Sequence, residues 1–309
     1  MGGKINMGVI SDFVDGITDS IKDFMTDAVE SSLKTAVDLI GVGLGDYSDD
    51  NGLISQYLYT QPTNFTGGGT TTIWSTIRIV CQNAVVPIGA SLATIVLLYE
   101  FISMISESNS FKHFDTSVFI RWIIKCLVVI LLVSNVFYLA SGIFSLGTKV
   151  VTDSSDTLNS LLHTTFEGGI DIGDDHSIGE LAVLWLCSGI VMISILILLA
   201  VIIVVLCSRM IEIMMYFGIS PIPMATFPNK EWSQIGHNWL RGLFALAFQG
   251  LFIVFAIAIY STLLMNVISS LSDGSNAFMQ MAMLIGYSVA LIFTILRTGS
   301  ISKSIFNAH

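Results

Sequence analysis

The sequence predicts an all-α, polytopic helical membrane protein. Hydrophobic residues make up 53% of its 309 residues and charged residues only 12%, and its mean hydropathy is +0.78. An ordinary soluble domain carries about 25% charged residues. Five apolar runs are long enough to cross a bilayer, which takes about 20 residues. We therefore expect about five transmembrane helices, together with a re-entrant hairpin broken by proline and an N-terminal amphipathic helix.

Residues 1–45 have the pattern of an amphipathic helix. Apolar residues recur at alternating steps of four and three, namely Ile10, Val14, Ile17, Ile21, Phe24 and Ala28. The other side is acidic, with Asp12, Asp15, Asp19, Asp23 and Asp27, which disfavours binding to anionic lipid. We interpret the apolar stripe as packing onto the rest of the chain, in preference to a coiled-coil assembly arm. Residues 46–72, with three consecutive glycines, are expected to form a flexible loop.

Residues 73–309 are predicted to be the transmembrane helical domain. The five apolar runs are 79–99, 122–144, 181–207, 243–268 and 278–296. Lysine and arginine gather after the first run, around residues 208–241 and in the C-terminal tail, while the loop 145–180 is acidic. Because basic residues stay on the cytoplasmic side, we expect a multi-pass protein of the cytoplasmic (inner) membrane. Its N-terminus and the loop 145–180 are placed outside, and its C-terminus inside.

The segment 208–241 is predicted to be a hairpin on the cytoplasmic side. Pro221 and Pro223 stand one residue apart in apolar sequence, and proline neither donates a backbone hydrogen bond nor continues a helix cleanly. The apolar part, 210–227, is therefore interpreted as a partial insertion into the membrane. Arg209 and Glu212 lie one turn apart and are expected to pair. This pair either holds the hairpin in place or lines a passage. Gln249, like other amide side chains within the spans, forms either a contact between helices or part of a channel lining.

The residues of an enzyme are not recognisable. The spans contain no His-Glu-x-x-His motif, no Gly-x-Ser-x-Gly motif and no facing aspartates, so we predict no catalytic residues. The four cysteines have unrelated spacings, which fits neither a zinc site nor a disulfide framework. Asp174, Asp175 and His176 are interpreted as a solvated loop because three adjacent residues do not surround a metal ion. We therefore expect no metal and no cofactor.

Residues 210–250 resemble the TrbL family, the polytopic inner-membrane subunits of type IV secretion systems, in particular its Gram-positive branch. The resemblance is carried by M-I-E-I-M-M-Y-F-G-I-S-P-I-P-M-A-T-F and by E-W-S-Q-I-G-H-N-W-L-R-G-L-F-A-L-A-F-Q-G. It implies a non-enzymatic structural subunit of the conjugation channel that moves a single-stranded DNA–relaxase complex through the lipid bilayer. It also implies a homo-oligomer and, as partners, the ATPases, other channel subunits and outer or cell-wall-facing components.

A secondary transporter of a small solute is the alternative, since transporters also use broken helices to bind solutes. Such a fold usually repeats the broken helix in a second half of the chain. Here Pro87, with Gln82 and Asn83 close by, is the only other intramembrane proline. The sequence therefore favours the channel subunit.

Overall fold

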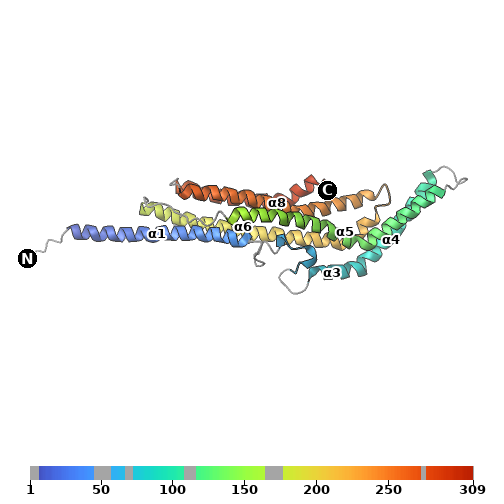
Figure 1. Cartoon of the computed structure of the whole chain (residues 1–309), viewed down its shortest axis with the longest axis horizontal. Helices are drawn as coiled ribbons and strands as arrows, with labels where there is room; N and C mark the ends of the chain where they lie inside the picture. The colour runs from blue at the N-terminus through green and yellow to red at the C-terminus, as the bar shows by residue number, and fades with distance from the viewer. Residues whose placement is uncertain are drawn as a thin grey trace, which may run out of the picture. The chain divides into compact units, whose positions relative to one another are not determined.

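The computed structural model describes residues 7–44, 57–66, 72–107, 116–163, 177–272 and 276–308, and every regular element in these ranges is helical. Figure 1 shows the chain coloured by residue number. The elements are α1 (Met7–Leu44), the 3-10 turn η1 (Pro62–Asn64), α3 (Ile73–Val80), the π-turn η2 (Cys81–Val85), α4 (Val86–Glu107), α5 (Thr116–His163), α6 (Ile178–Ile219), α7 (Pro221–Ala225), α8 (Ser233–Ser272) and α9 (Ala277–Ile305).

Five helices among the described residues are long and apolar enough to span a membrane, as the sequence predicts. They are Ile73–Ser106, Phe119–Ser154, Ile178–Ile219, Ser233–Leu271 and Ala277–Ile305. Each contains one of the five apolar runs. The all-α, multi-pass prediction is therefore confirmed. α1 covers most of the predicted N-terminal helix and is not one of the five.

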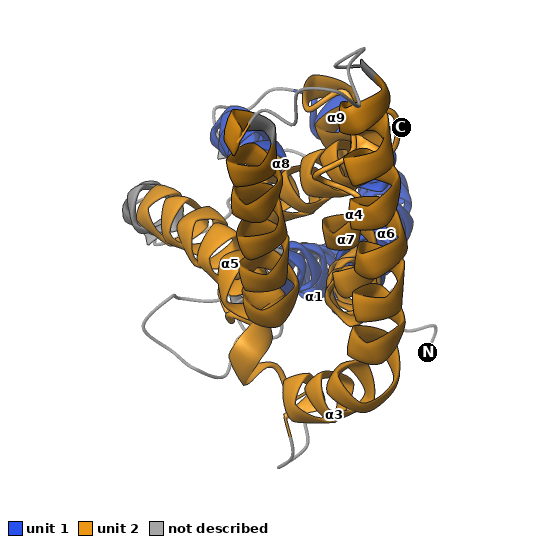
Figure 2. Ribbon diagram, turned by 90° about the vertical axis from the view of Figure 1, so that its right-hand side faces the viewer, with its two compact units in different colours: residues 1–55, 155–204, 255–296 blue, residues 56–154, 205–254, 297–309 orange. Residues whose placement is uncertain are grey.

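The chain divides into two compact units, coloured separately in Figure 2. One unit comprises Met1–Ser55, Ser155–Val204 and Phe255–Leu296, and the other comprises Gln56–Ser154, Val205–Val254 and Arg297–His309. We call them unit 1 and unit 2. The apolar runs 79–99 and 122–144 belong to unit 2, whereas the run 278–296 and most of 181–207 belong to unit 1. The run 243–268 contributes to both.

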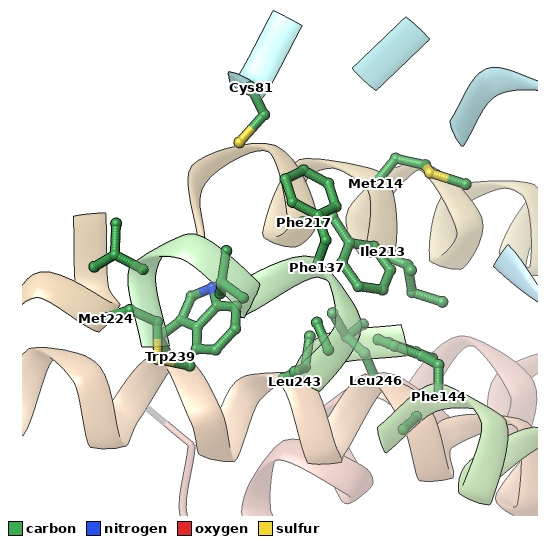
Figure 3. Close-up of a cluster of buried hydrophobic side chains, with 14 of the residues drawn as sticks. Cys81, Phe137, Phe144, Ile213, Met214, Phe217, Met224, Trp239, Leu243 and Leu246 are labelled. Atoms are coloured by element: carbon green, nitrogen blue, oxygen red, sulfur yellow. The ribbon is translucent and has the colours of Figure 1, made fainter. Parts of the chain in front are cut away.

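Unit 2 is built around a cluster of buried aromatic and aliphatic side chains (Figure 3). Phe217 of α6 is fully buried, and its ring centroid lies 4.5 Å from that of Trp74 and 5.3 Å from that of Phe144. Trp74 meets Phe217 edge-on, at 88°, an arrangement that aromatic quadrupoles favour. Unit 2 thus joins α3, α5 and α6 through large rings that leave little freedom in their spacing.

Unit 1 combines buried aliphatic residues with a hydrogen bond between α8 and α9. The buried aliphatic residues include Val191, Ile195, Leu198, Ile202, Ile257, Leu264, Leu284 and Leu291. The hydroxyl groups of Tyr260 on α8 and Ser288 on α9 lie 2.9 Å apart and are both buried. A buried hydroxyl needs such a partner, because lipid and aliphatic side chains supply none.

α5 differs from the prediction, because it continues well beyond the apolar run that ends at residue 144. The expected external loop 145–180 is helical as far as His163. Residues 145–163 contain no proline, and their single glycine, Gly147, packs closely against another helix. The polar residues after position 144 show where the apolar run ends. They do not end the helix, because tertiary contacts can support a helix through polar sequence.

Two distortions interrupt the helices of unit 2. Asn135 in α5 has φ −114° and ψ 16°, and its side-chain amide donates to the carbonyl oxygen of Leu131 at 3.0 Å. A side chain that occupies a carbonyl one turn back bends a helix. The wide turn η2 precedes Pro87, and the N–H of Val86 donates to Cys81, five residues earlier. The extra width accommodates the proline ring, which would clash with a carbonyl in a regular helix.

The predicted loop 46–72 is partly ordered. Pro62–Asn64 form a 3-10 turn, and Leu58 and Phe65 are buried. The ring centroid of Phe65 lies 5.5 Å from that of Tyr57. Residues 57–66 therefore contribute to unit 2, whereas the three glycines fall outside the described residues.

Gly147 allows α5 and α8 to approach each other closely. A Cβ atom at this position would lie 2.8 Å from the carbonyl oxygen of Ala247. Backbone cannot move aside as a flexible side chain can, so any larger residue separates the two helices. Gly142, in the same helix, faces open space.

We predict that Gly147→Ala destabilises the protein by about 1–3 kcal/mol because of this overpacking. Thermal unfolding of the purified protein in detergent measures the effect as a lower midpoint temperature. The matched control is Gly142→Ala, which should leave the midpoint unchanged or raise it, since alanine is the better helix former. Equal midpoints for the two variants would contradict the close approach.

Candidate functional site

The helix break between α6 and α8 lies at the prolines, as expected, but its boundary is later than expected. Residues 210–219 continue α6, and the chain leaves the helix at Ser220. Pro221 then occupies the first turn of α7. Backbone N–H groups in a first turn have no partner within the helix, so the N–H that proline lacks costs no hydrogen bond there. The structure therefore has a helical corner here, defined as residues 219–233, in place of a hairpin that begins at Met210.

Side chains satisfy the backbone groups that the corner frees. The hydroxyl of Ser220 donates to the carbonyl oxygen of Phe217 at 2.7 Å, and the hydroxyl of Thr226 donates to that of Pro223 at 2.8 Å. Both hydroxyl-bearing residues are buried, as are Pro221 and Pro223. The corner is thus a packed part of unit 2, which meets the requirement that irregular backbone in a membrane protein be enclosed by protein.

Two glycines fit the corner against its neighbours. A Cβ atom on Gly89 of α4 would lie 2.8 Å from the Cβ of Pro221 and 3.0 Å from its carbonyl oxygen. A Cβ atom on Gly236 of α8 would lie 2.8 Å from the carbonyl oxygen of Pro223. Each proline of the Pro-Ile-Pro motif therefore has a glycine opposite it. The two glycines allow α4 and α8 to pack closely against the corner.

A buried carboxylate ties the corner to two helices. Glu100 of α4 is only 4% exposed and forms an ion pair with Lys125 of α5. Its second oxygen accepts a hydrogen bond from the side-chain amide of Asn229 at 3.1 Å. The side-chain oxygen of Asn229 in turn accepts from the backbone N–H groups of Glu231 and Trp232. One carboxylate thus connects α4, α5 and the corner.

A second contact lies beside the first. The hydroxyl of Tyr99 donates to the carboxylate of Glu231 at 3.2 Å, and its ring stacks on Trp232 at a centroid distance of 6.0 Å. The sequence does not predict that Glu100 pairs with Lys125, because both residues lie near span ends, where a long side chain reaches water at little cost. The available indication was a carboxylate and an ammonium group that both border apolar runs, where an unpaired charge is expensive.

Arg209 does not pair with Glu212, contrary to expectation. Its side chain is buried and donates to the carbonyl oxygens of Leu246 and Ala247 on α8, at 3.1 and 3.3 Å. A Cβ atom on Gly250 would lie 3.0 Å from the guanidinium group. The arginine crosses to α8 because Gly250 leaves room for it there, and helix carbonyls can accept a second hydrogen bond.

Glu212 and Gln249 contact α9. Glu212 lies 3.7 Å from the ammonium group of Lys303, and both side chains are more than a third exposed. Gln249 is 7% exposed and covers Gly299, where a Cβ atom would lie 3.3 Å from its Nε2. The hydroxyl of Ser302 donates to the carbonyl of Ala245 at 2.5 Å. Arg209 and Gln249 are therefore interhelical contacts, and Glu212 belongs to an exposed ion pair.

Unit 2 also exposes polar side chains on helices that expose many apolar residues. α3 and η2 contribute Ser75, Arg78 and Gln82, and α5 contributes Asn135, Tyr138 and Ser145, all classed as exposed. The guanidinium carbon of Arg78 lies 6.0 Å from the centroid of the Tyr138 ring. This contact, of the cation–π type, joins the two helices. We call these six residues the polar surface.

The polar surface lies within two candidate membrane spans, Ile73–Ser106 and Phe119–Ser154. Apolar residues border it, with Ile79 59% exposed on α3 and Leu131 53% exposed on α5. Within the described part of the chain, Gln82 makes no hydrogen bond. Polar side chains in spans normally face other helices or a water-filled cavity. The polar surface is therefore a candidate contact with something other than lipid.

Metal chemistry finds no support among the described residues, where no three His, Cys, Asp or Glu side chains come together. The segment with Asp174, Asp175 and His176 lies outside these residues. The two clusters of polar contacts, around Glu100 and around Arg209, are both arrangements that hold helices together. The prediction that the chain has no catalytic residues, cofactor or metal stays a prediction.

The chain matches a known protein family. The model described as TrbL/VirB6 plasmid conjugal transfer like protein matches residues 49–221, more than half of the chain. The chain belongs to the TrbL/VirB6 family. It is accordingly a multi-pass component of conjugal transfer by type IV secretion, and it associates with other components of that system. Members of this family are structural channel subunits. No curated protein and no solved structure matches the chain.

The TrbL/VirB6 match overlaps the resemblance noted in the sequence only over residues 210–221 and otherwise covers residues that precede it. It ends at Pro221, so it includes α3, α4, α5 and α6 but neither α8 nor α9. The polar surface, Glu100 and Arg209 all lie inside it. α1 lies outside it.

For this TrbL/VirB6 protein we predict that Glu100→Gln lowers stability by about 1–3 kcal/mol, because it leaves the Lys125 ammonium group without its carboxylate. Thermal unfolding in detergent measures the loss. The control is Glu212→Gln, which breaks an exposed pair and should cost about 0.5 kcal/mol or less. Adding Lys125→Met to Glu100→Gln should recover part of the loss. A Glu212 variant as unstable as the Glu100 variant would refute the proposed importance of the buried Glu100 carboxylate.

Proposed function

We propose that the chain is a structural membrane subunit of a type IV secretion channel that translocates a single-stranded DNA–relaxase complex. Membership of the TrbL/VirB6 family is the observation that carries the proposal. The polar contacts of unit 2 support it, since Glu100 and Arg209 serve packing between helices. A protein with this organisation contributes a scaffold and a surface to the channel.

The polar surface is the part of the chain proposed to border the passage. Its exposed hydroxyl, amide and guanidinium groups would be costly against lipid, and a hydrated passage or a neighbouring subunit would hydrate or bind them. Arg78 adds a positive charge beside Tyr138, which suits a polyanion in transit. One arginine among neutral groups holds a nucleic acid weakly, which permits movement.

The cellular arrangement is part of the proposal. The distribution of basic residues supports the cytoplasmic (inner) membrane, with the N-terminus and the end of α5 outside and the C-terminus inside. The corner then faces the cytoplasm, where the ATPases of the system act. Outer or cell-wall-facing components would meet the external segments, and several copies would assemble around the passage.

Deletion of the gene from a conjugative donor should abolish DNA transfer without affecting growth or relaxase nicking. Nicking precedes translocation and does not require the membrane channel, so it serves as the internal control. Mating counts and a nicking assay measure the two steps, and a plasmid copy of the gene should restore transfer. Normal transfer, with loss of uptake or export of a small solute, would instead favour the transporter.

The polar surface yields a prediction about accessibility. In a chain whose four native cysteines are alanine, single cysteines at Gln82, Tyr138 and Ser145 should react with a membrane-impermeant thiol reagent in intact donor cells. The thiolate is the reactive form and needs water to exist. The matched controls are cysteines at Ile79, Leu139 and Leu146, which are exposed apolar residues on the same helices.

Reaction at the polar positions should be roughly tenfold faster than at the controls, as expected for a thiolate that forms in water and not in hydrocarbon. Mass spectrometry of the purified protein gives the extent of labelling at each time. Equal rates on the two sets of positions would show that the polar surface does not face water.

A further inference from the structure

α1 exposes an apolar stripe between Phe13 and Phe24. Five large side chains are exposed by 42–74% in the folded chain, namely Phe13, Val14, Ile17, Ile21 and Phe24. Water-exposed apolar area of this kind is worth about 25 cal/mol per Å² if it is covered. The expected packing of this stripe onto the rest of the chain is therefore not what the structure shows for residues 13–24.

The chain buries a different face of α1. Val29, Leu33 and Ala36 are each at most 2% exposed. At about 100° per residue, these three residues point about 110° away from the middle of the exposed stripe. The stripe is thus not the continuation of the buried face. α1 has one side that its own chain covers and a second apolar side that remains available.

The available side has the spacing of a coiled coil. Val14, Ile17, Ile21 and Phe24 follow one another at steps of three, four and three, which is the heptad pattern that keeps a seam facing a partner helix. The side-chain positions at its two ends, Ile10 and Ala28, continue the same steps in the sequence. β-Branched residues at both kinds of core position favour bundles of more than two strands.

The charges on α1 fit a second copy of the same helix as the partner. Positions beside the seam carry Phe13, Thr18, Ser20 and Met25, so identical helices bring few like charges together; Asp27 at the end is the one acidic residue there. Asp19 and Asp23 are exposed on the side opposite the seam. An anionic lipid surface would be repelled by this acidic side. α1 is therefore nearly neutral on the side where two copies would meet and acidic on the side that would face solvent.

We propose that residues 13–28 of α1 form a parallel coiled coil with the same segment of other copies of this chain. The orientation is parallel because all copies of a membrane protein cross the bilayer in the same sense. A segment of just over two heptads is marginal as an isolated coiled coil, but membrane anchoring of each copy raises the effective concentration of the helices. The inference rests on the proposed function, since it assigns an assembly role to α1 within a multi-subunit channel.

Disulfide cross-linking of the full-length chain in donor membranes tests the proposal. Single cysteines at Ile17 and Ile21, in the background without native cysteines, should yield dimers after mild oxidation. The matched controls are cysteines at Asp19 and Asp23, on the same turns but on the acidic side. Dimer yield should be at least roughly fivefold higher in the seam, because a disulfide needs Cα atoms within about 7 Å. Co-expression of two differently tagged copies identifies the product as a dimer of this chain.

A second variant keeps the result interpretable. Ile17→Lys with Ile21→Lys should lower the mass of the detergent-solubilised assembly, whereas Asp19→Lys with Asp23→Lys should leave it unchanged. Equal cross-linking on both sides of α1, no cross-linking at any position, or a seam product of different mass containing another protein would each overturn the proposal. Cross-linking is read in membranes and does not depend on DNA transfer, so cross-linked seam dimers together with normal transfer by the gene-deleted donor would count against the proposed function alone.

Discussion

The chain leaves its helical path between Ile219 and Ser233, and the buried polar groups freed there find partners within the protein. Neither lipid nor buried apolar side chains offer hydrogen bonds. Ser220 and Thr226 bond the carbonyls one turn back, and Asn229 closes the turn onto Glu231 and Trp232. The carboxylate of Glu100 then connects this turn to α4 and, through Lys125, to α5.

Glycine positions follow from the same requirement. Hydrogen bonds as short as these require the elements to approach closely, and Gly89 and Gly236 allow α4 and α8 to approach Pro221 and Pro223. Gly147 and Gly250 serve the contact between α5, α6 and α8, where the guanidinium group of Arg209 reaches two carbonyls. Close packing replaces the hydrophobic effect as the main attraction between helices in lipid. Buried charge and small residues thus act together in unit 2.

The polar groups of unit 2 divide into those that the chain satisfies internally and those that it exposes. Glu100, Arg209 and Asn229 are buried and bonded. Arg78, Gln82 and Tyr138 are exposed on helices that have the composition of membrane spans. A single copy in lipid would leave the second group poorly solvated. The exposed apolar stripe of α1 likewise has no covering partner within the described chain, and the proposed assembly of several copies would cover both surfaces.

The sequence by itself determined the class of the protein, the number of apolar helices, the N-terminal helix and the position of the break. Long apolar runs, the heptad-spaced stripe of residues 10–28 and the two prolines act locally, through solvent transfer and backbone geometry. The family resemblance at residues 210–250 pointed to the family whose model matches residues 49–221.

Only the tertiary structure decided which polar groups meet. Arg209 bonds α8 and not Glu212, Glu100 bonds Lys125 and Asn229, and α5 continues through residues expected to form a loop. A charged side chain several bonds long reaches partners on three or four helices, and local sequence does not say which helix leaves room. For Arg209 the helix is α8, because Gly250 has no side chain and leaves space for the guanidinium group. The partners of such groups depend on residues distant in sequence, so the folded arrangement is needed to identify them.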